Sequence, residues 1–499
     1  MAAARRFMRR EFGRTRLTKT AKSLIVVNEM RHLAASNVPP FPPSVALSAA
    51  SRLFSDKDLL RLVVPLIIEQ FLVFSLGFSD TIMAVWLGES EASGVSLVDG
   101  ICVLVSTLFS AMATGGVVVC AHYFGSKKDR MVSLAAKQLI YTMFGIGLAL
   151  SALGLLLRER LLPRLFGDID GEVMAASRIY FFYTLLSFPL SGLYSAAAAL
   201  FRAQGNSRVS MYTSLLVNVL NISGNALCVF ALGWGVAGVA IPTLVSRGVA
   251  GILLLALLYR AKPYRGRPAV DIRGLFRVRV DFRVIKHILA IGVPNGVENS
   301  MFHLGKILVL TLVAAFGTPA LTANAAVGNL ALLSTLPGSA VGAAVLIVVG
   351  QCLGAGKPDE AAYYVRRLMA GTYIAMFAVN IVLLLTAHPV IAVFGLEDDT
   401  EAFALRIYMS HCLCAMLIWP PSFALPNALR AANDAKFTMT VSMLSMWLVR
   451  VGLSHVFARY TDWSVVGTWV AMYADWTVRG AIFAARFLGG AWRRHYQLD

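Results

Sequence analysis

The sequence has few charged residues and few cysteines. Of its 499 residues, only 14% are Asp, Glu, Lys or Arg, against about 25% in soluble globular domains. The six cysteines are scattered and form no Cys-x-x-Cys pair, which excludes a disulfide scaffold and a cysteine-based zinc site. A water-soluble globular fold is therefore excluded by composition, and no cofactor or metal centre is expected.

Apolar residues are abundant instead, at 58% of the chain. They form twelve blocks of roughly 20 to 28 residues, each long enough to cross a ~30 Å hydrocarbon core as a helix. The blocks lack the alternation of barrel strands, and lipid leaves no other way to satisfy their backbone groups. We expect helices that begin near Leu59, Ser93, Leu139, Ala175, Val209, Val236, Ile288, Ala320, Leu368, Ala402, Phe437 and Val465.

The distribution of charge predicts the orientation of these spans. With twelve spans, the segments that lie on the side of both termini carry 35 of the 45 Lys and Arg residues, whereas the opposite loops include GESE and GLEDDTE. Basic loops stay in the cytoplasm, so we expect a plasma-membrane protein with both termini inside. The basic pI of about 9.9 is then a signal of topology, which points to anionic membrane lipid and not to nucleic acid as the partner.

The chain contains an internal duplication. A shift of 229 residues superposes VPLIIEQ on VPNGVEN, which places Pro65 over Pro294 and Glu69 over Glu298. Each copy holds six spans, and an even number gives both copies the same orientation. The expected fold is an all-α polytopic membrane protein with twelve helices in two six-helix lobes related by a pseudo-twofold axis. The expected domains are a basic cytoplasmic tail (1–55), a first lobe (56–260), a basic cytoplasmic linker (261–284), a second lobe (285–490) and a cytoplasmic C-terminal tail (491–499).

Several motifs together resemble the multidrug and toxic compound extrusion (MATE) transporters of bacteria. They are GFSDTIMAVWLGESEASG and ATGGVVVCAHYFG in the first half, and AAFGTPALTANAAVGN, VVGQCLGAGKPDEA and GTWVAMYADWTVRG in the second. The resemblance covers roughly residues 56 to 494. It implies the MATE fold and a secondary exporter, not an enzyme, that expels organic cations or amphipathic drugs in exchange for H⁺ or Na⁺.

Asp80 is the strongest candidate for the coupling-ion site. Eleven residues separate it from Glu69, so the two carboxylates share one stripe of the first helix, and a buried charge must face protein, water or a partner. Span 5 adds a polar stripe of Asn218, Asn221 and Asn225. The resemblance implies an acid at the last of these positions, where this chain has Asn225, which leaves open whether Asp80 binds H⁺ or Na⁺. The alternative is that these side chains only hold helices together.

The second lobe has its own polar residues, and Lys306 is the least usual because it lies in the middle of span 7. An ion pair between Lys306 and a carboxylate is one expectation, and a second polar site comprises Glu298, Asn299, His303 and Lys306. Asp475 and Arg479 are four residues apart on span 12, so we expect a structural ion pair.

Substrate contacts are expected from aromatic and methionine side chains, because these accommodate varied organic cations. The candidates are Phe74, Phe78, Met83, Met301 and Phe302. Two alternatives stay open: a flippase for lipid or lipid-linked saccharide with the same architecture, and a membrane-embedded enzyme, for which the sequence has no catalytic motif. We expect a monomer.

Overall fold

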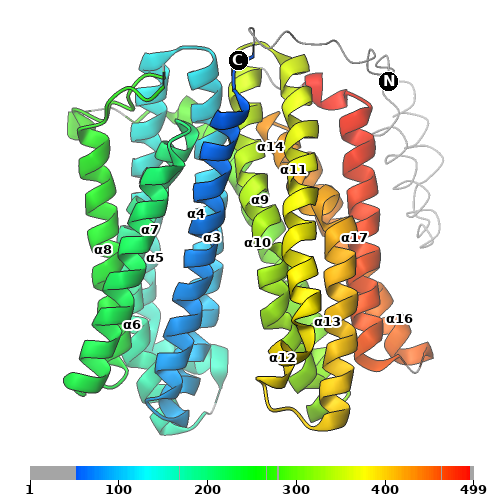
Figure 1. Ribbon diagram of the computed structural model, residues 1–499. Helices are drawn as coiled ribbons and strands as arrows, with labels where there is room; N and C mark the ends of the chain where they lie inside the picture. The colour runs from blue at the N-terminus through cyan, green and yellow to red at the C-terminus, as the bar shows by residue number, and fades with distance from the viewer. Residues whose placement is uncertain (1–51, 168, 266, 278–279, 462, 495–499) are drawn as a thin grey trace, which may run out of the picture.

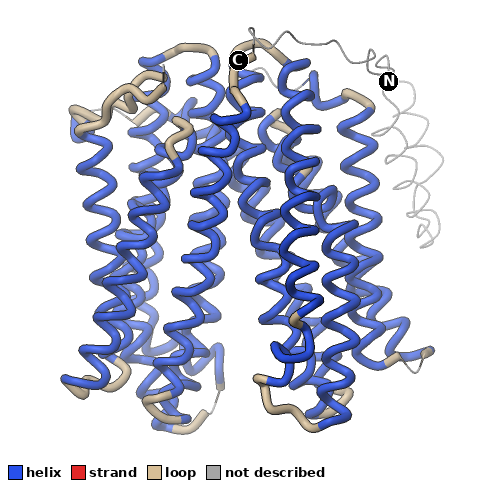
Figure 2. The backbone as a smooth tube through the Cα atoms, in the orientation of Figure 1, coloured by secondary structure: helices blue, strands red, loops and turns tan. Residues whose placement is uncertain are grey.

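The computed structural model describes residues 52–167, 169–265, 267–277, 280–461 and 463–494. These residues form long helices joined by short loops, and no strand occurs among them (Figure 2). The predicted tails at 1–55 and 491–499 lie for the most part outside the described residues. Helix formation follows from the apolar blocks, and local signals set some of the ends. Ser55, for example, forms a capping box with Asp58 at the start of the first described helix.

The first lobe comprises six long helices, which Figure 1 shows as a bundle coloured from blue to green. They are α3 (Asp56–Val85), α4 (Glu89–Gly125), α5 (Asp129–Phe166), α6 (Gly171–Ala203), α7 (Ser207–Ala226) and α8 (Ala237–Tyr259). A wide π-helical turn at Leu227–Ala231 extends α7. A 3₁₀ turn at Leu275–Arg277 lies in the segment that leads to the second lobe.

The second lobe repeats this order with more interruptions. Its helices are α9 (Phe282–Ala314), α10 (Thr318–Gly354), α11 (Pro358–Leu385), α12 (Ala387–Ala392), α13 (Asp398–Trp419), α14 (Pro426–Ala431), α15 (Ala435–Leu444), α16 (Gly452–Tyr460) and α17 (Ser464–Leu488). Wide turns at Pro420–Ala424 and Ser445–Val451 join α13 to α14 and α15 to α16. A final 3₁₀ turn spans Ala491–Arg494.

Eleven of the continuous helical segments in the described residues are long and apolar enough to cross a membrane. The twelfth, α17, is 25 residues long but includes Asp475 and Arg479, which lower its hydropathy. The prediction of an all-helical membrane protein is confirmed, and of the twelve predicted spans eleven meet this measure while α17 supplies the twelfth long helix.

The two copies of the repeat match in detail. Helices α4 and α10 both contain 37 residues, and they begin and end at positions that differ by the shift found in the sequence. The residues before them, Gly88 and Gly317, have φ of +133° and +97°. Only glycine adopts such a backbone without strain, so the same turn starts the equivalent helix in each lobe.

The lobes meet at one face of the molecule, which we call the closed face. It carries the loops 126–128, 204–206, 355–357 and 432–434 and lies at the top of Figure 1. A Cβ atom added at Gly125 would overlap the carbonyl oxygen of Gln351, and one added at Gly354 would overlap that of His122. Helices α4 and α10 thus cross with their backbones in direct contact.

Side chains reinforce this crossing in both directions. His122 Nε2 lies 2.7 Å from the carbonyl oxygen of Ala431 in the second lobe, and Gln351 Nε2 donates to that of Ala203 in the first lobe, also at 2.7 Å. Contacts between the lobes reach as far as the middle of α4, where Thr107 Oγ1 lies 3.5 Å from His303 Nε2. The lobes are therefore joined from the closed face to mid-helix.

Candidate functional site

A polar cluster in the first lobe surrounds Asp80 on α3. Asn225, at the end of α7, donates a hydrogen bond from Nδ2 to Asp80 Oδ1 at 2.7 Å. The same group lies 3.2 Å from Asn221 Oδ1, and Asn221 Nδ2 donates to Thr243 Oγ1 on α8 at 2.9 Å. The two asparagines are fully buried, so α7 and α8 present a connected set of polar groups to the carboxylate on α3.

The cluster contains an oxygen atom that is not used in any recorded hydrogen bond. Asn225 Oδ1 is buried and has no hydrogen-bond partner in the structure, although buried polar atoms are normally satisfied. Together with Asp80 it offers the oxygen ligands that a hard cation prefers, while a proton would need only the carboxylate.

Two further charges act on Asp80. Arg247 on α8 and Asp99 on α4 both interact with it electrostatically, and Arg247 Nη1 donates to Ser187 Oγ at 2.9 Å. The cluster thus has two acids and one base. Neither Arg247 nor Asp99 was among the residues assigned to this site from the sequence.

Glu69 and Asn218 do not belong to the cluster. Glu69 Oε2 accepts a hydrogen bond from Ser210 Oγ at 2.8 Å, and its Oε1 lies 3.8 Å from Arg202. Asn218 donates to the carbonyl oxygen of Ser214 on its own helix at 2.9 Å. The helical period places Glu69 on the same face of its helix as Asp80, and Asn218 on the same face as Asn225. It cannot show that residues on one face contact different neighbouring helices at different heights.

The four polar residues proposed for the second lobe do not form one site. Glu298 accepts from Arg430 Nη2 at 2.8 Å, His303 faces Thr107 across the lobe contact, and Asn299 is half-buried. Lys306 makes no ion pair within the part of the chain that the structure describes. Its Nζ lies 5.1 Å from the centre of the Phe302 ring, so an aromatic face replaces the expected carboxylate.

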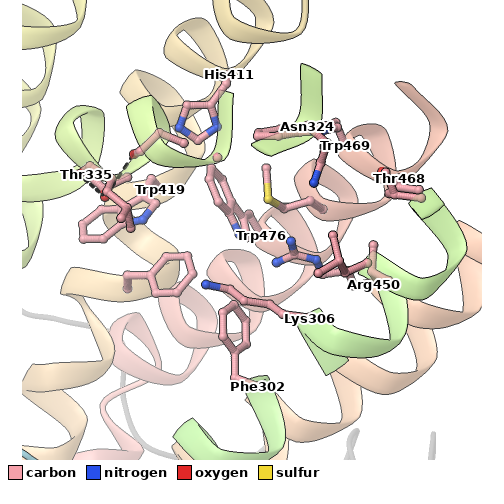
Figure 3. A pocket seen from close by; sticks show the side chains of 18 of the residues that line it. Phe302, Lys306, Asn324, Thr335, His411, Trp419, Arg450, Thr468, Trp469 and Trp476 are labelled. Carbon is pink, nitrogen blue, oxygen red and sulfur yellow. Dashed lines mark hydrogen bonds between the residues drawn. The ribbon is translucent and has the colours of Figure 1, made fainter. Parts of the chain in front are cut away.

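Lys306 lines a cavity of about 460 Å³ inside the second lobe. Figure 3 shows its side chain and that of Arg450 pointing into the same space. The walls are largely aromatic, formed by Phe302, Trp419, Phe423, Trp469 and Trp476. Of the five substrate-contact candidates, only Phe302 lines this cavity; Phe74 and Phe78 stack on each other along α3 with ring centres 6.2 Å apart.

Asp475 and Arg479 lie behind this cavity with Oδ2 and Nη2 3.8 Å apart, and both side chains are almost fully buried. Ser445 Oγ also donates to Asp475 Oδ1 at 2.5 Å. The pair therefore joins α17 to the wide turn Ser445–Val451, which carries Arg450.

A smaller cavity of about 210 Å³ lies between the lobes, beneath the closed face. Residues of α3, α4, α6, α10 and α14 line it, among them Gln70, Thr114, Arg202, Ser339 and Asn427. Its lining is polar and almost neutral, because Arg202 lies against Glu69.

The residues that sequence reasoning missed are the tryptophans and Arg450 of the second-lobe cavity, and Thr243 and Arg247 beside Asp80. An arginine in the middle of an apolar block was itself a signal of function. The partners of these residues come from helices distant in the sequence, so spacing along one helix could not identify them.

Comparison with known proteins shows the same repeat. The MatE family model matches residues 65–227 and again 294–456, and these two matches begin 229 residues apart. The uncharacterized transporter YisQ of Bacillus subtilis is 28% identical over 462 residues, which cover 90% of this chain and 98% of the relative. The probable multidrug resistance protein NorM of Thermotoga maritima is 24% identical and covers 88% of this chain and 93% of its own length.

A solved structure of a MATE protein in complex with MaL6 has the same fold. It superposes with a TM-score of 0.81 at 17% identity, and the alignment covers 88% of this chain and 97% of the other. The match of the family model to both halves decides the assignment. The chain belongs to the MATE family, whose members are membrane transporters and not enzymes.

Proposed function

We propose that this protein is a secondary exporter of amphipathic organic compounds, driven by the exchange of H⁺ or Na⁺ at Asp80. The observation that carries the proposal is the hydrogen bond from the buried Asn225 to the half-buried Asp80, beside an amide oxygen that lacks a hydrogen-bond partner among the described residues. An exporter that is driven by an ion gradient needs a binding site for that ion, and this cluster would provide one within the first lobe. The name of the NorM relative, a probable multidrug resistance protein, supports an organic substrate.

The arrangement of the lobes supports alternating access. Lobes 56–260 and 285–490 are joined by backbone contacts at the closed face and by a side-chain contact at mid-helix, so movement about these contacts would expose the inter-lobe space to one side at a time. The closed face carries the basic loops, which we place in the cytoplasm of the cell. In this arrangement the closed face would seal the cytoplasmic side of the inter-lobe space.

The lipid flippase alternative has less support. A pyrophosphate-linked lipid would need several unpaired cations between the lobes, whereas Arg202 is the one basic residue among the described lining of the inter-lobe cavity and is close to Glu69. We propose that the protein works as a monomer in the plasma membrane, since each lobe supplies its own polar sites.

The decisive experiment measures efflux of a fluorescent dye from proteoliposomes under an imposed pH gradient and, separately, under an imposed Na⁺ gradient. Efflux that depends on one of these gradients supports the proposal and identifies the ion. Protein that inserts correctly but gives no gradient-dependent efflux with any of a panel of amphipathic dyes would contradict it.

A further inference from the structure

The cavity of the second lobe has aromatic walls and an excess of positive charge. Three tryptophans and Phe302 line a volume of about 460 Å³, which is within the range of small-molecule sites. Aromatic walls alone would suit an organic cation. The charges of the side chains therefore decide which ligand fits.

Two cations project into this space. Lys306 Nζ and the guanidinium carbon of Arg450 lie 5.1 and 5.6 Å from the centre of the same Phe302 ring. Neither has a carboxylate within ion-pair distance in the described parts of the chain, and no described residue that lines the cavity is acidic. Two like charges that face one space repel each other, so a cationic ligand would add to the repulsion and an anion would relieve it.

The wall of the cavity also contains buried hydrogen-bond donors that have no acceptor among the described residues. Arg450 is only 9% exposed, yet its Nε has no hydrogen-bond partner in the structure, and the same holds for Trp476 Nε1. Both groups are donors only, and leaving buried donors unsatisfied costs free energy. These buried nitrogens leave unsatisfied donors in the wall, and an anion between Lys306 and Arg450 would interact with the positive charge of both side chains.

The buried pair behind the cavity does not cancel this charge. Asp475 lies 3.8 Å from Arg479 and also interacts electrostatically with Arg450, so the one acid of this region is shared by two bases while Lys306 adds a third positive charge. Arg479 does not line the cavity but packs on two of its aromatic side chains, with its guanidinium carbon 4.2 Å from the centre of the Phe423 ring and 5.5 Å from that of Phe302. The region thus keeps two positive charges in excess.

We propose that the second-lobe cavity binds an aromatic organic anion, with its carboxylate between Lys306 and Arg450 and its ring among the tryptophans. Arg450 is held in place by the wide helical turn Ser445–Val451, a type of turn that is frequent at functional sites. The inference deepens the proposed export function, because it assigns the substrate class and places the substrate and coupling sites in different lobes.

The test is isothermal titration calorimetry on the full chain in zwitterionic nanodiscs, without any ion gradient. Three probes of equal shape are compared: 2-naphthoate, 2-naphthylmethanol and 2-naphthylmethylammonium. We expect 2-naphthoate to bind about tenfold more tightly than the alcohol, as one additional charged contact allows, and the ammonium compound to bind most weakly. Equal or tighter binding of the ammonium probe would overturn the proposal.

Variants locate the site. Lys306→Met should remove the preference for the carboxylate, Lys306→Arg should retain most of it, and the matched control Lys436→Met, an exposed lysine on α15 in the same lobe, should leave it unchanged. A carboxylate preference that survives Lys306→Met would contradict the assignment. If phosphatidylglycerol in the nanodisc displaces 2-naphthoate, a lipid headgroup is the occupant and a soluble aromatic anion is wrong.

The binding assay separates this inference from the proposed function. If export under ion gradients fails but 2-naphthoate binds through Lys306, the exchange mechanism is wrong and the anion site stands. If gradient-driven dye export is observed but the carboxylate preference is absent, the exporter stands and the anion site is wrong.

Discussion

Where the first lobe has Asp80, the equivalent position of the second lobe has Val309, and where the first has Asn221, the second has Arg450. The two lobes share one helical plan, with α4 and α10 equal in length, yet the charged groups around their polar sites differ in sign. Asp80 and Asp99 outnumber Arg247 in the first, while Lys306 and Arg450 face a cavity without acids in the second. The comparison teaches that a duplicated fold can keep its backbone while the charged side chains inside its two halves diverge.

The largest expected effect comes from the acid that has no counterpart. Asp80→Asn keeps the shape of the side chain but removes the charge that attracts a coupling cation, so we expect gradient-driven efflux to fall more than ~tenfold, as is typical when an essential ion ligand is lost. Initial rates in proteoliposomes measure this. The matched control is Asp399→Asn, an exposed acid at the start of α13 on the side opposite the closed face, and it should transport normally. Unchanged efflux in Asp80→Asn would show that the acid found only in the first lobe does not couple transport to an ion.

Glu69 and Glu298 occupy equivalent positions in the two lobes, and each lies near an arginine. Replacing each in turn tests whether the two ion pairs contribute equally to stability. Glu298→Ala leaves the buried Arg430 without its partner at 2.8 Å, and loss of one member of a buried pair costs about 3 to 5 kcal/mol. Glu69→Ala should cost less, because Arg202 is 3.8 Å away and its side chain is more exposed, at 21% against 10%. Thermal unfolding of the two purified variants measures the difference; an equal loss would show that the two pairs are equivalent.

The crossing of α4 and α10 should be sensitive to a single methyl group. Gly354→Ala places a Cβ against the backbone oxygen of His122, which cannot move aside, and we expect a loss of about 1 to 3 kcal/mol. Gly371→Ala on α11 is the control, since a Cβ there meets open space and should stabilise the helix slightly. Unfolding temperatures that rise in both variants would contradict a backbone contact at the closed face.

The smallest expected effect tests whether the acidic character of the first lobe can be increased. Asn225→Asp places a second carboxylate beside Asp80, where the present contact is 2.7 Å, and two carboxylates this close do not both remain ionised easily. We expect transport to persist, with a pH profile moved to higher pH or with a changed Na⁺ dependence. Identical profiles for the variant and the natural chain would show that position 225 does not contact the coupling ion.

The sequence predicted the helices well because each is marked by an apolar block and polar loops. The starts of two helices were missed by ten residues, at Asp129 and Pro358, which are equivalent positions of the repeat. In both, the helix begins in a polar stretch that projects beyond the apolar block. Hydropathy detects the part of a helix that contacts lipid and not its full length.

The sites were predicted only in part, for a related reason. Asp80 and Asn225 were identified because a carboxylate and amides are unusual in apolar helices. Thr243 and Arg247 come from α8, and the cavity around Lys306 combines five separate segments. The spacing of residues along one helix gives its faces, but which faces meet depends on how the helices pack.

The reciprocal contacts at the closed face bear on how such a chain can evolve. In two identical subunits on a twofold axis, one mutation would alter both contacts together, whereas a fused gene lets each half mutate alone. His122 and Gln351 show the result, since an imidazole and an amide now bond the same kind of helix end in opposite lobes. Gly125 and Gly354 have not diverged, because backbone proximity leaves no second residue that would fit.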